Sequence, residues 1–118
     1  YAYSLISIKI RNNMYTDLEK DYTKTRYLQI LQETKLIAEN KISLNSSFED
    51  LEMWISIIKQ IEDIRDKIVE SQILFDWDEI YERYSIGAIG LECFEDDDEM
   101  QTRLCDIFHG AVHYSELK

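Results

Sequence analysis

The chain has 118 residues and a net charge of −11, and 45% of its residues are hydrophobic and 12% aromatic. This length fits a single domain, 1–118, and so apolar a composition excludes a disordered chain. The negative charge argues against direct binding to nucleic acid or to an anionic membrane, and it favours a cationic protein partner.

Cysteine, proline and glycine usage narrows the fold class and the compartment. Two cysteines, Cys93 and Cys105, are too few for a disulfide framework, which favours reduced thiols in a cytoplasmic protein. No window is apolar over the roughly 18 residues of a membrane span, and no signal-peptide pattern is present. The chain has no proline and only three glycines, so the turn residues of a many-stranded protein are missing. We therefore expect an all-α bundle of four to five helices.

The first predicted elements precede residue 41. Residues 3–11 fit a short amphipathic helix and also a β-strand, and we favour a helix because no second strand-like run offers a pairing partner. Thr16 and Glu19 form a capping box that opens a long helix over 17–40.

The helix predicted at 47–72 is expected to be the centre of the bundle. Apolar residues at steps of three and four form a stripe along this helix, and Phe48, Ile57 and Ile64 broaden it. The resulting apolar face is too wide to be covered by one neighbouring helix. Ser46 or Ser47 is expected to cap its start. The short connection over 40–46 predicts that the helices at 17–40 and 47–72 pack antiparallel. The stepped apolar positions are Leu51, Trp54, Ile55, Ile58, Ile61 and Ile68.

Two shorter helices are predicted in the C-terminal part. Asp76 caps the first, which carries Trp77, Ile80, Tyr81 and Tyr84. Gly87 and Gly90 are expected to end it, and a loop is predicted from Ile86 to about Asp98. The last helix follows this loop with six apolar residues inward, namely Met100, Leu104, Ile107, Phe108, Ala111 and Val112.

Acidic residues are concentrated after position 45, where the chain has nineteen acidic residues and six basic ones. Aromatic residues lie among the acids, and rings rimmed by carboxylates suit an interface with a Lys/Arg-rich protein, because the rings give desolvated contact and the charges steer encounter. A solvated, solubilising surface is the alternative interpretation. The predicted partner-binding residues are Asp76, Trp77, Asp78, Glu79, Glu82, Glu95, Asp96, Asp97 and Asp98.

Catalytic and metal-binding motifs give little support to an enzyme. Cys105, His109 and His113 are spaced four apart, but one zinc ion hardly reaches three residues along eight positions of a straight helix. We favour a buried thiol and partly exposed imidazoles over a metal site. EF-hand, nucleophile-elbow, phosphate-loop and dinucleotide patterns are missing. We expect no catalytic residue, no metal and no cofactor, and a metal-dependent helical enzyme is the least favoured class.

A small, acidic, helical chain with aromatic residues among its carboxylates resembles the immunity proteins of bacterial toxin systems, including colicin and contact-dependent growth inhibition systems. The resemblance is one of type and covers the whole chain. It implies an antitoxin that binds a basic cognate toxin, a nuclease domain, and neutralises it by covering its active site or docking beside it. The alternative is a helical adaptor or regulatory subunit that binds a partner helix in an apolar groove.

Overall fold

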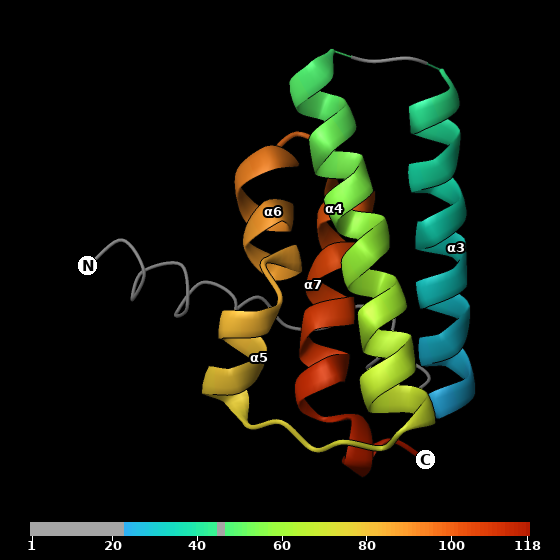
Figure 1. The fold of residues 1–118 in the computed structure, drawn as a ribbon, viewed down its shortest axis with the longest axis vertical. Coiled ribbons are helices and arrows are strands. Elements are labelled where there is room, and N and C mark those ends of the chain that lie inside the picture. The colour runs from blue at the N-terminus through green and yellow to red at the C-terminus, as the bar shows by residue number, and fades with distance from the viewer. Residues whose placement is uncertain (1–22, 45–46) are drawn as a thin grey trace.

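The computed structural model describes residues 23–44 and 47–118, apart from the side chain of Asp98. Over these ranges the chain is all-α, as predicted, and has no strand (Figure 1). The helix or strand predicted at 3–11 and the capping box of Thr16 and Glu19 lie outside the described residues. The α-helices are α3 (Lys24–Ser43), α4 (Phe48–Ile64), α5 (Trp77–Arg83), α6 (Ile86–Cys93) and α7 (Asp98–Val112), joined by the π-helix η1 (Arg65–Glu70) and followed by the 3-10 turn η2 (Tyr114–Glu116).

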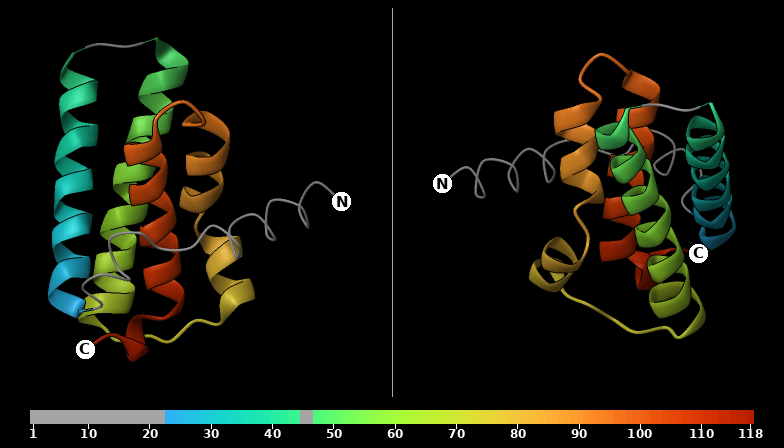
Figure 2. Two further views of the ribbon diagram at one scale, coloured as in Figure 1. Left: turned by 180° about the vertical axis from the view of Figure 1, so that it is seen from behind. Right: turned by 45° about the horizontal axis from the view of Figure 1, so that its top comes forward.

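Helices α3 and α4 form the predicted antiparallel pair, side by side in Figures 1 and 2. The side-chain oxygen of Thr23 accepts a hydrogen bond from the Arg26 N–H at 3.0 Å, which caps the start of α3. The Ser47 hydroxyl accepts one from the Asp50 N–H at 3.3 Å, which confirms the second of the two caps proposed for α4. Ser46, the other candidate, lies outside the described residues.

Helix α4 is a core helix, but its buried face is narrower than predicted. Trp54, Ile57, Ile61 and Ile64 are buried, whereas 73% of Phe48 and 42% of Ile55 remain exposed. The helix continues as η1, in which backbone bonds span five residues. Gln72, with φ of 53°, follows this segment.

The loop predicted from Ile86 to Asp98 is wrong in its first part, because Ile86–Cys93 forms α6. Its glycines lower helix propensity, by about 1 kcal/mol each. At Gly90 the missing side chain permits close packing, since a Cβ there would lie 3.0 Å from the Leu104 Cβ. The Gln101 amide also donates to the Gly90 carbonyl at 3.2 Å. Packing against α7 therefore outweighs the propensity of α6.

Helix α7 carries the longest continuous buried stretch of the described chain, residues 104–111. It contacts α3, α5 and α6. Tyr27 of α3 crosses to it and donates its hydroxyl hydrogen to the Ile107 carbonyl at 2.7 Å. The Tyr27 ring fills the space beside Gly110, where a Cβ would overlap it. The centre of the bundle is thus α7 together with α4.

We predict that Gly110→Ala destabilises the protein by about 1 to 3 kcal/mol, because the added methyl group overpacks the Tyr27 ring. Helix propensity alone would act in the opposite direction by about 1 kcal/mol. Urea unfolding followed by circular dichroism measures the difference. In a Tyr27→Leu background the same substitution should cost much less, and a Gly110→Ala protein as stable as the parent would contradict the contact.

Candidate partner-binding surface

The nine predicted partner-binding residues fall into two groups rather than one patch. Five belong to α5 and its cap, Asp76 to Glu82, and four belong to the α6–α7 turn and the start of α7, Glu95 to Asp98. Figures 1 and 2 show these groups at opposite ends of α6. A helix of eight residues spans about 12 Å, so the two groups are separated by about that length.

In the α5 group, two carboxylates are engaged by the backbone. The Glu79 N–H donates to Asp76 Oδ1 at 2.9 Å, and the Asp76 N–H donates to Glu79 Oε1 at 3.1 Å. This reciprocal capping box confirms the predicted cap at Asp76. Asp78 and Glu82 are exposed and make no ion pair with the described residues.

The aromatic residues near this group mainly pack inward. Trp77 is half-buried, and its ring lies 5.1 Å edge-on from the Phe108 ring, between centroids. Tyr84 is only 2% exposed. Trp77 therefore anchors α5 on α7, and Tyr84 is unavailable as an exposed anchor. The partner-binding role of Trp77 stays a prediction.

Tyr84 and Arg83 tie the α5–α6 junction to α4 through Asp63. The Tyr84 hydroxyl donates to Asp63 Oδ2 at 2.6 Å, and Arg83 Nη2 lies 3.2 Å from the same oxygen. Burial and then the bond to Asp63 raise the pKa of Tyr84 to about 12. Burial alone would raise the pKa of Asp63, but the hydrogen bonds from Tyr84 and Arg83 outweigh it and lower that pKa below its ordinary value.

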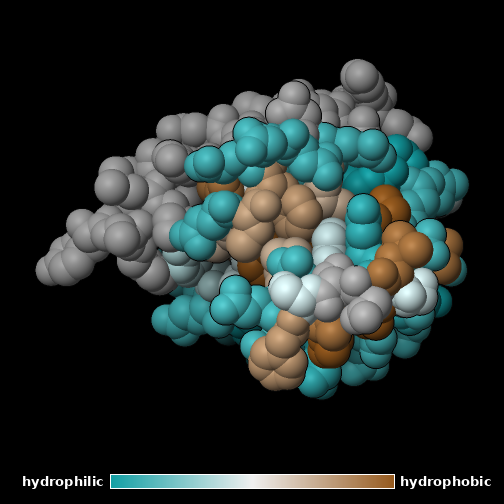
Figure 3. Space-filling view, turned by 90° about the horizontal axis from the view of Figure 1, so that it is seen from above, coloured by the Kyte–Doolittle hydropathy of each residue, from teal (hydrophilic) through white to brown (hydrophobic). Residues whose placement is uncertain are grey.

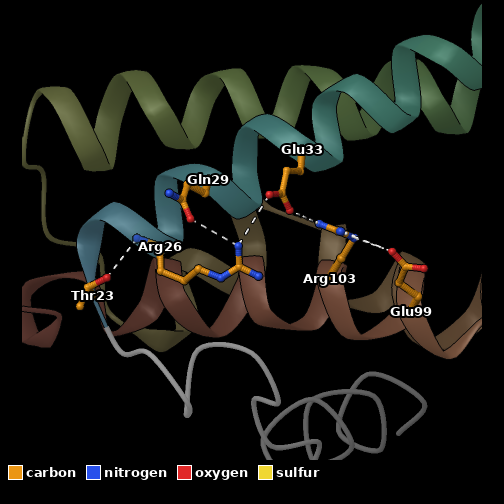
Figure 4. A network of polar contacts seen from close by, with 6 residues as sticks. All are labelled: Thr23, Arg26, Gln29, Glu33, Glu99 and Arg103. Carbon is orange, nitrogen blue, oxygen red and sulfur yellow. Dashed lines mark hydrogen bonds and ion pairs between the residues drawn. The ribbon is translucent and has the colours of Figure 1, made fainter.

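A second polar network neutralises Glu99 in the first turn of α7. Arg103 Nη1 lies 3.0 Å from Glu33 of α3, and Arg103 Nη2 lies 3.3 Å from Glu99 (Figure 4). Arg26 adds a longer contact to Glu33, at 3.7 Å. Glu99 is therefore paired, whereas Glu95 and Asp96 of the α6–α7 turn form no ion pair with a described residue.

At the end of the bundle where α3 and α6 end and α4 and α7 begin, side chains line a cavity of about 400 Å³ that is open to solvent. Figure 3 looks onto this end and shows apolar side chains exposed next to hydrophilic ones. Lys41, Asp50 and Asp97 are the charged residues of its lining. The other lining residues are Ile37, Met53, Trp54, Cys93, Phe94 and Met100.

We use the name end face for this cavity and the exposed carboxylates on the adjoining helix ends and turn. These carboxylates are Glu49, Glu92, Glu95 and Asp96. Asp97 is partly engaged, because its Oδ1 accepts from the Met100 N–H at 3.0 Å and caps α7. Asp98 is the first residue of α7, and its side chain lies outside the described part.

The negative charge of the end face affects the pKa of the Cys93 thiol. Partial burial, and then the charges of Glu92 and Asp50, raise the pKa of Cys93 above its ordinary value. A raised pKa keeps the sulfur protonated and weakly nucleophilic at neutral pH. The arrangement therefore suits binding better than thiol chemistry.

Sequence reasoning missed Asp50, Trp54 and Cys93 as members of one site. Residues 86–98 were predicted as a loop, so the sequence pattern gave no position for Cys93 relative to the start of α4. The usable signal was the spacing of Ile86, Ile89 and Cys93 at steps of three and four, which is typical of a helix.

The Cys/His series of α7 is distributed over different environments. Cys105 is 1% exposed and His109 6% exposed, and the His109 ring lies 6.3 Å from that of Trp77. His113 Nδ1 lies 2.7 Å from Glu116 Oε2. Among the described residues, no three His, Cys, Asp or Glu side chains are grouped to hold a metal ion.

Comparisons with protein-family models, curated proteins and solved structures found no match. The candidate site therefore rests on its own geometry. None of the helices between residues 23 and 118 that the structure describes is both long and apolar enough to cross a membrane.

We predict that Tyr84→Phe lowers stability by about 1 to 2 kcal/mol at pH 7, because Asp63 loses its shortest hydrogen bond. The raised pKa of Tyr84 also means that the folded parent keeps a proton that the unfolded chain releases above pH about 10. Parent stability should thus fall from pH 10 towards 12 more steeply than that of Tyr84→Phe. Urea unfolding at several alkaline pH values tests this, and equal slopes would contradict the buried hydroxyl.

Proposed function

We propose that the protein is a non-catalytic antitoxin of the immunity type, which binds a basic toxin domain, such as a nuclease, through the acidic end face. One observation carries the proposal: exposed carboxylates that form no ion pair with described residues lie around a cavity lined in part by apolar side chains at one end of the bundle. Apolar contact supplies binding energy once water is excluded, and the surrounding charge selects and steers a cationic partner.

The distribution of ion pairs supports this use of the end face. On the sides of the bundle, Lys35 lies 3.6 Å from Glu62, and Arg83 and Arg103 hold their own carboxylates. At the end face, neither Glu95 nor Asp96 forms an ion pair with any described residue. Unpaired like charges repel and weaken the folded state. Asp78 and Glu82 on α5 also form no ion pair with the described residues, but at the end face the exposed carboxylates lie beside a pocket lined in part by apolar side chains, and this combination favours a role in recognition.

A nuclease is the kind of target that such a surface would suit. It must present cationic groups to hold phosphate, and carboxylates can compete for those groups. We place the interaction in the cytoplasm as part of this proposal. The two free thiols, Cys93 and Cys105, are consistent with a reducing compartment.

Only part of the predicted binding surface belongs to the end face. Glu95, Asp96 and Asp97 belong to the end face, whereas Asp76 and Glu79 cap α5. Asp78 and Glu82 lie on the separate α5 surface, and they provide a charge-matched control for the experiment.

A helical adaptor is the second candidate, and a groove along α4 favours it. The groove has a volume of about 770 Å³ and is lined in part by the exposed side chains of Phe48 and Ile55. An amphipathic partner helix could bind there through apolar contacts. Such binding depends weakly on ionic strength, whereas binding steered by the end face weakens steeply with added salt.

We predict that the chain protects cells from the toxic product of the gene adjacent to its own, and that Glu95→Lys with Asp96→Lys slows association with that purified product at least tenfold at low salt. Survival on co-expression and stopped-flow association rates measure these effects. The control, Asp78→Lys with Glu82→Lys, changes the net charge equally and should slow association far less. Failure of protection by the parent chain, or equal slowing by both pairs, would contradict the proposal.

A further inference from the structure

We propose that the end-face cavity binds an arginine side chain presented by a basic partner protein. The aliphatic stem packs on Met53 and Phe94, and the guanidinium pairs with Asp50. This inference rests on the proposed function, because it names the group through which a basic partner engages the end face.

The floor of the cavity is built from residues that the core holds in place. Trp54 is 6% exposed and Met100 4% exposed, and the Trp54 and Phe94 rings lie 5.4 Å apart between centroids. An arginine buries its methylene groups along such an apolar surface while its charged end stays at the rim. The thioethers of Met53 and Met100 adapt to the shape of an inserted stem.

The charged residues of the lining favour a cation. The Asp50 backbone N–H is bonded to Ser47, but the exposed Asp50 carboxylate has no bond to a described residue. Asp97 keeps one oxygen beyond the one that caps α7. These two carboxylates face a single Lys41 among the described lining residues, and Glu92 adds a further negative charge nearby. The charges of Glu92 and Asp50 also contribute, after burial, to the raised pKa of Cys93.

Arginine matches this combination better than other side chains. A purely apolar side chain would cover Asp50 without a partner, and burial of an unpaired carboxylate is costly. The planar guanidinium can bind a carboxylate with two parallel hydrogen bonds and can also stack on the Phe94 ring, whereas an ammonium group acts as a point charge. An acidic side chain is repelled.

The two tryptophans allow a direct test in the full chain. Trp54 lines the cavity, whereas Trp77 packs on Phe108 away from it, so their indole N–H signals provide a reporter and an internal reference in ¹H–¹⁵N spectra. The probe is acetyl-Ala-Leu-Arg-Leu-Ala-amide, and its control replaces arginine by citrulline, which keeps the shape and removes the charge. We expect the arginine peptide to shift the Trp54 signal alone and to bind about tenfold more tightly than the citrulline peptide.

Asp50→Asn should remove most of this preference for arginine, and Glu82→Gln on α5 should leave it unchanged. Unchanged Trp77 signals in both variants show that the fold is retained. Three results would overturn the arginine site. The two peptides could bind equally, or the Trp77 signal could shift as much as the Trp54 signal. The Trp54 signal could also shift with protein concentration and not with added peptide. Peptide binding without protection from a toxin would contradict only the proposed function, and protection that Asp50→Asn leaves intact would contradict only the arginine site.

Discussion

The structure depends on how closely other helices approach α7. Tyr27 reaches across from α3, occupies the space beside Gly110 and donates a hydrogen bond to the Ile107 carbonyl. Gly90 lets α6 approach Leu104 from another side. Interiors pack at nearly crystalline density, so these close contacts decide how near α3 and α6 lie to α7. The remaining elements are arranged around this packed unit.

The end face is a consequence of that packing. Once α6 lies against α7, its last residue, Cys93, and the following Phe94 are held beside Trp54 of α4. The α6–α7 turn then places Glu95 and Asp96 at the same end as the start of α4, where Asp50 lies. The start of α4, the end of α6 and the α6–α7 turn thus bring together carboxylates that are far apart in the sequence, around a cavity lined in part by core side chains.

The starts of α4 and α5 and the antiparallel pair could be predicted from sequence, because they depend on local chemistry. The cap of α3 at Thr23, which falls inside the helix predicted over 17–40, was not predicted. Ser47 and Asp76 cap their helices through side-chain bonds to residues three positions ahead. The role of Gly90 could not be predicted in this way. A glycine can end a helix, or it can lie inside a helix and permit close packing. Which of the two occurs depends on the surface that the helix packs against. The missed α6 also explains why the acids were expected on one patch.

The end face forms only if α6 brings Phe94 onto Trp54. The most direct measurement is the nuclear Overhauser effect between the ring protons of these two residues in the folded chain. We predict clear cross-peaks, because the ring centroids lie 5.4 Å apart, and their loss in a Trp54→Leu variant that remains folded. Absence of these cross-peaks in a well-resolved spectrum of the parent would contradict the account.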